Sequence, residues 1–103
     1  MSSIDLNGLR EAVEAGRYVT TAHAKQRMGL RKITDADAQT VIATGDLAEE
    51  YPDAKPFPKC LLMAHVGGEP LYVACAFGDR YAYIITVHRY DADVWLDPWT
   101  RKR

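Results

Sequence analysis

Residues 59–77, which read KCLLMAHVGGEPLYVACAF, decide the fold. The glycine pair Gly67–Gly68 separates two apolar segments, and this pattern predicts a β-hairpin with a two-residue turn. In that register Cys60 lies opposite Cys75. The stretch therefore predicts two paired antiparallel strands in the second half of the chain.

One face of this hairpin is predicted to be buried. The facing pairs on it are Cys60–Cys75, Leu62–Val73 and Ala64–Leu71. Cross-strand apolar pairs of this kind stabilise a sheet. The facing cysteines are expected to be small buried side chains without a disulfide, as in other chains of reducing compartments. The sequence leaves open whether they ever oxidise.

A further strand is predicted over residues 81–90, after a turn at 78–80. The length of that turn decides which face each side chain takes, because a shift of one residue moves every side chain to the other face. The residues that face the cysteines are Ile84, Thr86 and His88 for a two-residue loop, and Tyr83, Ile85 and Val87 for a three-residue loop. The face of His88 thus stays open.

The first half of the chain has the apolar spacing of helices. We expect helices over residues 4–15, 23–31 and 35–44. The expected N-caps are Ser3 or Asp5, Thr20 or Thr21, and Thr34, and the expected C′ glycines are Gly16 and Gly45. Residues 17–21 carry a β-branched patch that is too short to define a strand by itself.

These elements predict a single α+β domain over residues 1–103. Helices over about 4–45 would pack on one face of a roughly four-stranded antiparallel sheet over about 47–90. An irregular tail would cover 91–103, with Trp95 and Trp99 closing one end of the sheet. The helix-free face would be partly open, and it is the natural place for a site.

Composition excludes some classes of function. The net charge is −1 and the sequence pI is about 6.3, so contact with nucleic acid must be local rather than general. The two cysteines form no CxxC pair and no Cys/His cluster with zinc spacing, and we expect no metal and no cofactor. No apolar run approaches 18 residues, so we expect no membrane segment and a cytoplasmic location.

The first candidate site lies on the predicted second helix. His23, Arg27 and Arg31 are spaced i, i+4 and i+8, which places them along one helical face. A group that titrates near neutral pH beside fixed cations suits binding an anion and moving a proton next to it. Such a histidine can act as general base or acid when the 2′-hydroxyl of RNA attacks its own phosphate. The alternative is a basic, solvated helix face.

The second candidate cluster is formed by His88 and Arg89, beside Thr86 and Tyr90, at the end of the last predicted strand. A hydroxyl, an imidazole and a guanidinium there could position a phosphate. The alternative is a strand end of mixed polarity.

Several motifs together resemble one family. They are His23-Ala24, Arg27-Met28, Arg31, Ile33-Thr34, Gly45, Tyr51-Pro52, Leu71–Ala74 and Ile84–Val87. In this combination the chain resembles the small bacterial domain-of-unknown-function family 4258, over roughly residues 22–87. That family has been grouped with the RelE-like and barnase–EndoU-like (BECR) ribonuclease folds, which include toxins of toxin–antitoxin and polymorphic toxin systems.

The resemblance implies helices packed on an antiparallel sheet and metal-independent RNA cleavage. The positions that match the family are His23, Arg27 and Thr86, and less closely Arg31. His88 stands where the family leads us to expect an aromatic residue such as tyrosine.

The sequence therefore suggests two alternative functions. The first is an RNA-cleaving RelE-like toxin, with RNA as substrate and an antitoxin-like protein as partner. Its catalytic residues would be His23, Arg27, Thr86 and His88, and its substrate-binding residues Arg31, Lys32 and Arg89. The second is a non-catalytic module for binding protein or RNA, in which His23 is hydrogen-bonded to the sheet and Arg27 is paired with Glu49 or Glu50. The sequence does not decide whether there is activity, nor the oligomeric state.

Overall fold

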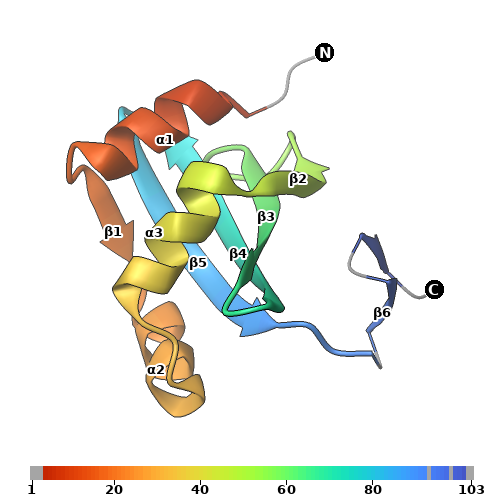
Figure 1. The fold of residues 1–103 in the computed structure, drawn as a ribbon. Helices are drawn as coiled ribbons and strands as arrows, with labels where there is room; N and C mark the ends of the chain where they lie inside the picture. Colours follow the sequence, from red (N-terminus) through yellow and green to blue (C-terminus); the bar gives the residue numbers. More distant parts are fainter. Residues whose placement is uncertain (1–3, 93, 98, 102–103) are drawn as a thin grey trace.

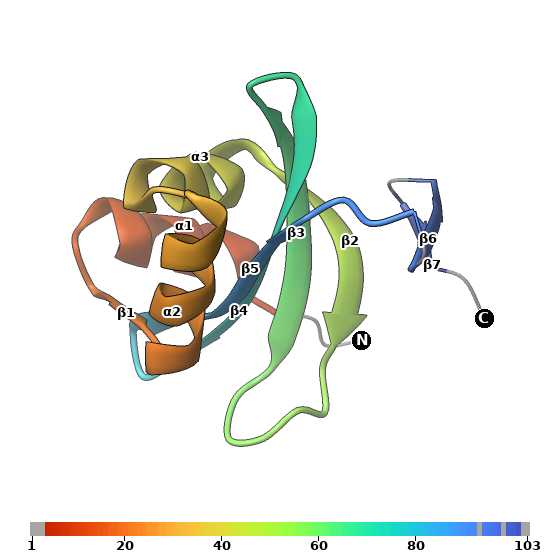
Figure 2. The same ribbon diagram turned by 90° about the horizontal axis from the view of Figure 1, so that it is seen from below.

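Three helices cover one face of a mixed five-stranded sheet, and a small C-terminal hairpin lies on its other face (Figure 1, Figure 2). The computed structural model describes residues 4–92, 94–97 and 99–101. The helices are α1 (Leu6–Glu14), α2 (Ala22–Arg31) and α3 (Asp35–Thr44). The strands are β1 (Tyr18–Thr20), β2 (Asp46–Tyr51), β3 (Lys59–Val66), β4 (Glu69–Gly78), β5 (Tyr81–Arg89), β6 (Trp95–Asp97) and β7 (Thr100–Arg101). The expected α+β class is confirmed.

The sheet has the strand order β1-β5-β4-β3-β2. Strands β2 to β5 are antiparallel as predicted, but β1 adds a fifth strand, parallel to β5. The four-stranded prediction missed β1 because three residues carry too little pattern to reveal a strand. Their pairing depends on β5, a distant part of the chain.

The central hairpin has the predicted register. Gly67 and Gly68 form its turn with φ of 64° and 84°, a backbone conformation that glycine adopts without steric cost. Cys60 lies opposite Cys75, and their Sγ atoms are 3.8 Å apart as free, buried thiols. This face of the hairpin packs under the helices in the main core.

The pairing of β4 with β5 differs from both predicted registers. The turn has two residues, Asp79 and Arg80, but a β-bulge follows: Ala74 pairs with Thr86, and Cys75 pairs with Ile84. The extra residue, Ile85, reverses the alternation between the two faces. Ile84 and Val87 therefore both lie in the main core, whereas Thr86 and His88 lie on the helix-free face.

Helix α2 covers the edge of β5 beyond the end of β1. Thr21 caps the helix by accepting a hydrogen bond from the amide of Ala24, and its hydroxyl donates to the carbonyl of Ile85. At the other end of α2, Arg31 donates from Nη1 to the carbonyl of Val87 at 3.3 Å. These contacts satisfy carbonyl groups of β5 that no neighbouring strand reaches.

Helix α3 is closed at both ends by side-chain contacts. Thr34 and Asp37 form a capping box at its start. At its end Gly45 has a φ of −74°, so it is not the predicted C′ glycine in the left-handed region. Glycine fits there because an added Cβ would lie 2.4 Å from the carbonyl oxygen of Val41.

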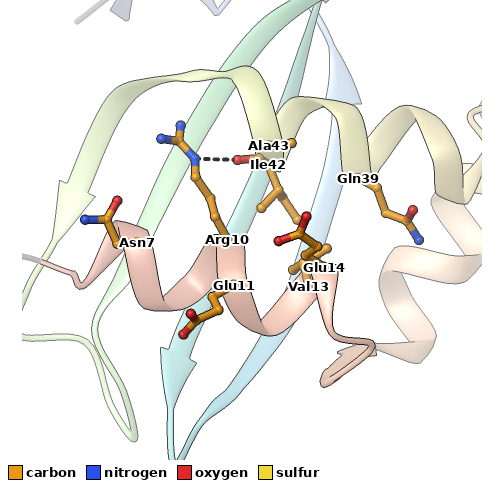
Figure 3. A pocket seen from close by; sticks show the side chains of 8 residues that line it. All are labelled: Asn7, Arg10, Glu11, Val13, Glu14, Gln39, Ile42 and Ala43. Atoms are coloured by element: carbon orange, nitrogen blue, oxygen red, sulfur yellow. Dashed lines mark hydrogen bonds between the residues drawn. The ribbon is translucent and has the colours of Figure 1, made fainter.

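Arg10 of α1 completes the end of α3 (Figure 3). Its Nε donates to the carbonyl of Ile42 at 2.8 Å, and its Nη2 donates to that of Gly45 at 2.5 Å. The guanidinium lies beside a cavity of about 610 Å³ between α1 and α3. Arg10 thereby holds the two helices together and supplies the positive charge that a helix C-terminus favours.

The C-terminal segment contains the paired strands β6 and β7, so the prediction of an irregular tail is wrong for these residues. Residues 93, 98, 102 and 103 of that predicted tail lie outside the described residues. Trp95 is 1% exposed and closes a second, smaller core with Tyr72, as expected, whereas Trp99 is 45% exposed. Within the described ranges, no helix is both long and apolar enough to cross a bilayer.

We predict that Arg10→Met lowers the free energy of unfolding by about 1–3 kcal/mol, because it leaves two helix-terminal carbonyl groups without their charged donor. Urea denaturation would measure the change. The control is Arg17→Met, which removes a hydrogen bond from Nε to the exposed carbonyl of Arg80 and should change stability by less than about 0.5 kcal/mol. Equal losses in both variants would contradict the role assigned to Arg10.

Candidate functional site

The helix-free face of the sheet is organised in rows of side chains that cross the strands. The strand registers define three rows: Met63, Tyr72 and His88; then Glu49, Leu61, Ala74 and Thr86; then Tyr51, Lys59, Ala76 and Tyr83. At the centre of the middle row the small side chain of Ala74 leaves space between its larger neighbours. A cavity of about 210 Å³ lies there, and we call it the sheet-face cavity. Its polar lining consists of Glu49, Tyr51, Lys59, Thr86, His88 and Arg101.

An ion pair closes one side of the sheet-face cavity. Arg101 donates from Nε and Nη2 to the two carboxylate oxygens of Glu49, each at 2.9 Å. The hydroxyl of Tyr51 also donates to Glu49. The hydrogen bond from Arg101 lowers the pKa of Glu49 in spite of its partial burial. Glu49 is therefore a carboxylate at neutral pH.

The pKa of the Tyr51 phenol is shifted upwards, whereas that of Glu49 is lowered. Burial and the neighbouring Glu49 carboxylate raise its pKa from 10.0. Tyr51 thus keeps its proton at neutral pH and can act as a hydrogen-bond donor in the cavity.

His88 forms the opposite side of the cavity. Its ring stacks on Tyr72, with centroids 5.2 Å apart and planes 13° apart, and its Nδ1 lies 3.4 Å from the carbonyl oxygen of Arg89. Burial lowers the pKa of His88 from 6.5, the Arg89 carbonyl opposes this, and the positive charges of Arg31 and Arg101 add to the lowering. The imidazole is therefore mainly neutral at pH 7 and can accept a proton.

The C-terminal hairpin positions Arg101 over this face. Trp95 stacks on the buried ring of Tyr72, with centroids 4.8 Å apart, and the guanidinium of Arg101 lies 4.7 Å from the centroid of the Trp95 ring. Tyr90 fixes the hairpin by donating from its hydroxyl to the carbonyl of Trp95. Burial raises the pKa of Tyr72 to about 12, so its phenol stays neutral beneath the hairpin.

A second cavity, of about 520 Å³, lies beside His88 and is lined by Arg31, Arg89 and Trp95 among others. Arg89 donates from Nη2 to the backbone carbonyl of Arg31 at 3.4 Å. Two cations from α2 and β5 are thereby held near the one imidazole that both cavities share.

The structure brings together part of the predicted site. Thr86 and His88 line the sheet-face cavity, and Arg31 and Arg89 meet at His88. His23, Arg27 and Lys32 are exposed side chains of α2 and its C-cap, and they line neither cavity.

His23 therefore fits neither functional hypothesis, and its exposure agrees with the alternative of a basic, solvated helix face. It is not enclosed by the sheet, as the binding-module hypothesis expected, and it is not in a cleft with Thr86 or His88, as the catalytic hypothesis expected. Glu49 pairs with Arg101 rather than Arg27, because β2 is one edge of the sheet whereas α2 packs on β5, three strands away.

Sequence reasoning missed four of the six residues in the polar lining of the sheet-face cavity: Glu49, Tyr51, Lys59 and Arg101. A signal existed for Glu49 and Tyr51, since their i, i+2 spacing places both on one face of β2. The predicted hairpin register could have extended that face to Leu61 and Ala74. Arg101 gave no signal, because its position depends on how the C-terminal hairpin docks.

The arrangement offers groups for proton transfer and for holding an anion. A neutral imidazole, a carboxylate, a protonated phenol and two cations surround one cavity. Across residues 4–92, 94–97 and 99–101, no group of three His, Cys, Asp or Glu side chains is placed to hold a metal ion.

Comparison with known proteins gives a family. The model of the family described as "Domain of unknown function (DUF4258)" matches residues 20–89. The match covers more than half of the chain, so the chain belongs to this family, as the motif resemblance indicated. No curated protein and no solved structure matches the chain, and the RelE-like part of the resemblance has no support from these comparisons.

The matched segment contains β2 to β5 and hence Glu49, Tyr51, Lys59, Thr86 and His88. The hairpin that carries Arg101 follows it. The cavity is thus made by the family segment and closed by a residue outside it.

We predict that His88 titrates below 6.5, because folding removes its ring from water and places cations near it. Two-dimensional NMR of the imidazole protons would measure the pKa. In the variant Trp95→Leu, which loosens the cover formed by the hairpin, the pKa should move towards 6.5. A His88 pKa at or above 6.5 in the wild-type protein would contradict the burial described here.

The same shift predicts a pH-dependent stability. The folded-state pKa of His88 lies below the unfolded-state value, so the unfolded chain binds more protons in the window between them. The free energy of unfolding should fall as pH decreases from 6.5 through the folded-state pKa. In His88→Gln this part of the slope should vanish, whereas the loss below about pH 4.5 from the lowered pKa of Glu49 should remain. Urea denaturation between about pH 2 and 8 would check both parts.

Proposed function

We propose that this member of the DUF4258 family is a metal-independent ribonuclease whose reaction takes place in the sheet-face cavity. One observation carries the proposal: a neutral histidine, a protonated tyrosine and a guanidinium lie around a single small cavity. Cleavage of RNA by its own 2′-hydroxyl needs a proton acceptor, a proton donor and a cation for the phosphate, and it needs no further reactant.

In this mechanism neutral His88 takes the proton of the 2′-hydroxyl. The 2′-oxygen then forms a bond to phosphorus while the bond from phosphorus to the 5′-oxygen breaks. The hydroxyl of Tyr51 turns from Glu49 to the departing 5′-oxygen, gives it the proton and regains one from water, and His88 releases its proton to water. The products are a 2′,3′-cyclic phosphate and a 5′-hydroxyl.

The charges around the cavity support phosphate binding. Arg101 and Lys59 line the cavity, and Arg31 and Arg89 lie on the other side of His88. A chain with a net charge of −1 attracts RNA only where cations gather locally, and this face of the sheet is such a place. Glu49 would keep Arg101 oriented towards the cavity through its two hydrogen bonds.

The remaining sequence predictions belong to this proposal. His23, Arg27 and Lys32 would bind RNA away from the reacting phosphate, since they are exposed on α2 and its C-cap. RNA is the proposed substrate, and an antitoxin-like protein is the proposed partner of a toxin. A catalytic role for His23 stays a prediction, and the experiment below separates it from His88.

We predict that the purified protein cleaves single-stranded RNA in the presence of EDTA and leaves 2′,3′-cyclic phosphate ends. His88→Ala should lower kcat/KM about 100- to 10,000-fold, the range of general acid–base catalysis, and Tyr51→Phe should lower it within the same range. Gel analysis of a labelled RNA pool, with chemical identification of the ends, would measure both.

Two histidine variants serve as controls. His65→Ala changes an exposed residue near the β3–β4 turn and should leave cleavage unchanged. His23→Ala should weaken RNA binding slightly and keep kcat. Loss of kcat in His23→Ala with full activity in His88→Ala would move the reaction to α2. Binding of RNA without cleavage by the wild-type protein would favour the non-catalytic module.

A further inference from the structure

A cleft of about 320 Å³ adjoins the sheet-face cavity. Its lining includes Lys55, Phe57, Lys59, Ala76 and Tyr83. Lys59 and Ile85 line both the cleft and the cavity, so the two spaces lie side by side on the helix-free face.

Two aromatic rings form the wall of this cleft. Phe57 and Tyr83 stack with centroids 5.8 Å apart and planes 16° apart. Gly78 allows this position, because an added Cβ there would lie 2.1 Å from Cδ1 of Phe57. The rings are only partly buried, so they leave apolar aromatic surface in contact with solvent.

The rim of the cleft is cationic. Lys55 and Lys59 both line it, and the ammonium of Lys59 lies 5.6 Å from the centroid of the Tyr51 ring, at the boundary with the sheet-face cavity. Among the residues that the structure describes, no carboxylate lines the cleft. Aromatic surface beside ammonium groups suits a ligand with a flat ring next to a phosphate.

We propose that this cleft is a nucleobase subsite, which holds the base of a nucleotide next to the phosphate in the sheet-face cavity. The inference rests on the proposed function, because its ligand is the RNA bound there. Lys59 would contact the phosphate between the two nucleotides, and the base would stack on the Phe57–Tyr83 pair. Stacking alone accepts any base.

The test uses oligonucleotides that cannot be cleaved. Four 2′-O-methyl RNA tetramers, each with a single kind of base, would be compared with an abasic tetramer that has the same phosphates. Fluorescence anisotropy measures each Kd. At least one base-bearing tetramer should bind about 5- to 100-fold more tightly than the abasic one, as expected for stacking on aromatic rings.

Variants of Tyr83 test whether the tighter binding of base-bearing tetramers arises in the cleft. Tyr83→Leu should remove most of the difference between base-bearing and abasic tetramers without changing the abasic Kd, while Tyr83→Phe should retain it. Tyr81→Leu is the matched control, since Tyr81 is 43% exposed, lies on the same strand and does not line the cleft. If Tyr83→Leu does not fold, shifts of the Phe57 ring protons on titration of the wild-type protein replace it.

The outcomes separate the two proposals. Equal binding of all tetramers by a protein that cleaves RNA would overturn the subsite and keep the proposed function. Binding of no tetramer, together with no cleavage, would overturn both. A loss of base preference in Tyr81→Leu as large as in Tyr83→Leu would also overturn the subsite, because the preference would then not arise in the cleft.

Discussion

Opposite the bond between Ala74 and Cys75, β5 has one more residue than β4, and much of the molecule depends on that extra residue. The bulge at Ile85 lets Ile84 and Val87 both face the helices, so the core is not interrupted. It also turns Thr86 and His88 to the other face, where the cavity lies. The carbonyl of Ile85 accepts the hydroxyl of Thr21, the residue that caps α2. One irregularity thus joins the core, a helix and the candidate site.

The helix-free face combines side chains of strands β2 to β5 with those of the C-terminal hairpin. Tyr72 of β4 is its centre, since His88 and Trp95 each stack on it. Trp95 brings the C-terminal hairpin down onto the sheet, and Arg101 then reaches Glu49 on β2. The pKa shifts of His88 and Glu49 follow from this docking of the hairpin. Burial removes water from His88, and Arg101 brings a positive charge to Glu49.

Local patterns predicted the features that local residues determine. The Gly67–Gly68 turn set the hairpin register, and Thr34 marked the start of α3. Features that depend on distant segments were missed. No glycine or proline marks the bulge at Ile85, β1 exists only through its pairing with β5, and Arg101 is placed by the docking of Trp95.

The candidate site was predicted with the same limits. In α2 the buried residues Ala24 and Met28 have helical spacing, but this spacing does not determine what the opposite, exposed face meets. His23 was therefore assigned to a cleft from which it is absent, while Arg31, two turns later, does lie at a cavity with His88. In physical terms the sequence determines which side of an element is polar, and the tertiary packing determines which polar sides meet.

The open edge of the sheet has a consequence for self-association. Helix α2 covers the edge at β5, so within the described residues β2 is the long strand whose outer edge pairs with no other strand. The unpaired N–H and C=O groups of an edge strand can pair with strands of other copies, and this leads to aggregation. In β2 the exposed carboxylates of Asp46 and Glu50 and the bulge after Leu47 oppose such pairing, because a second copy would meet like charge and an irregular ladder. The acidic, irregular edge thus opposes strand pairing between separate molecules.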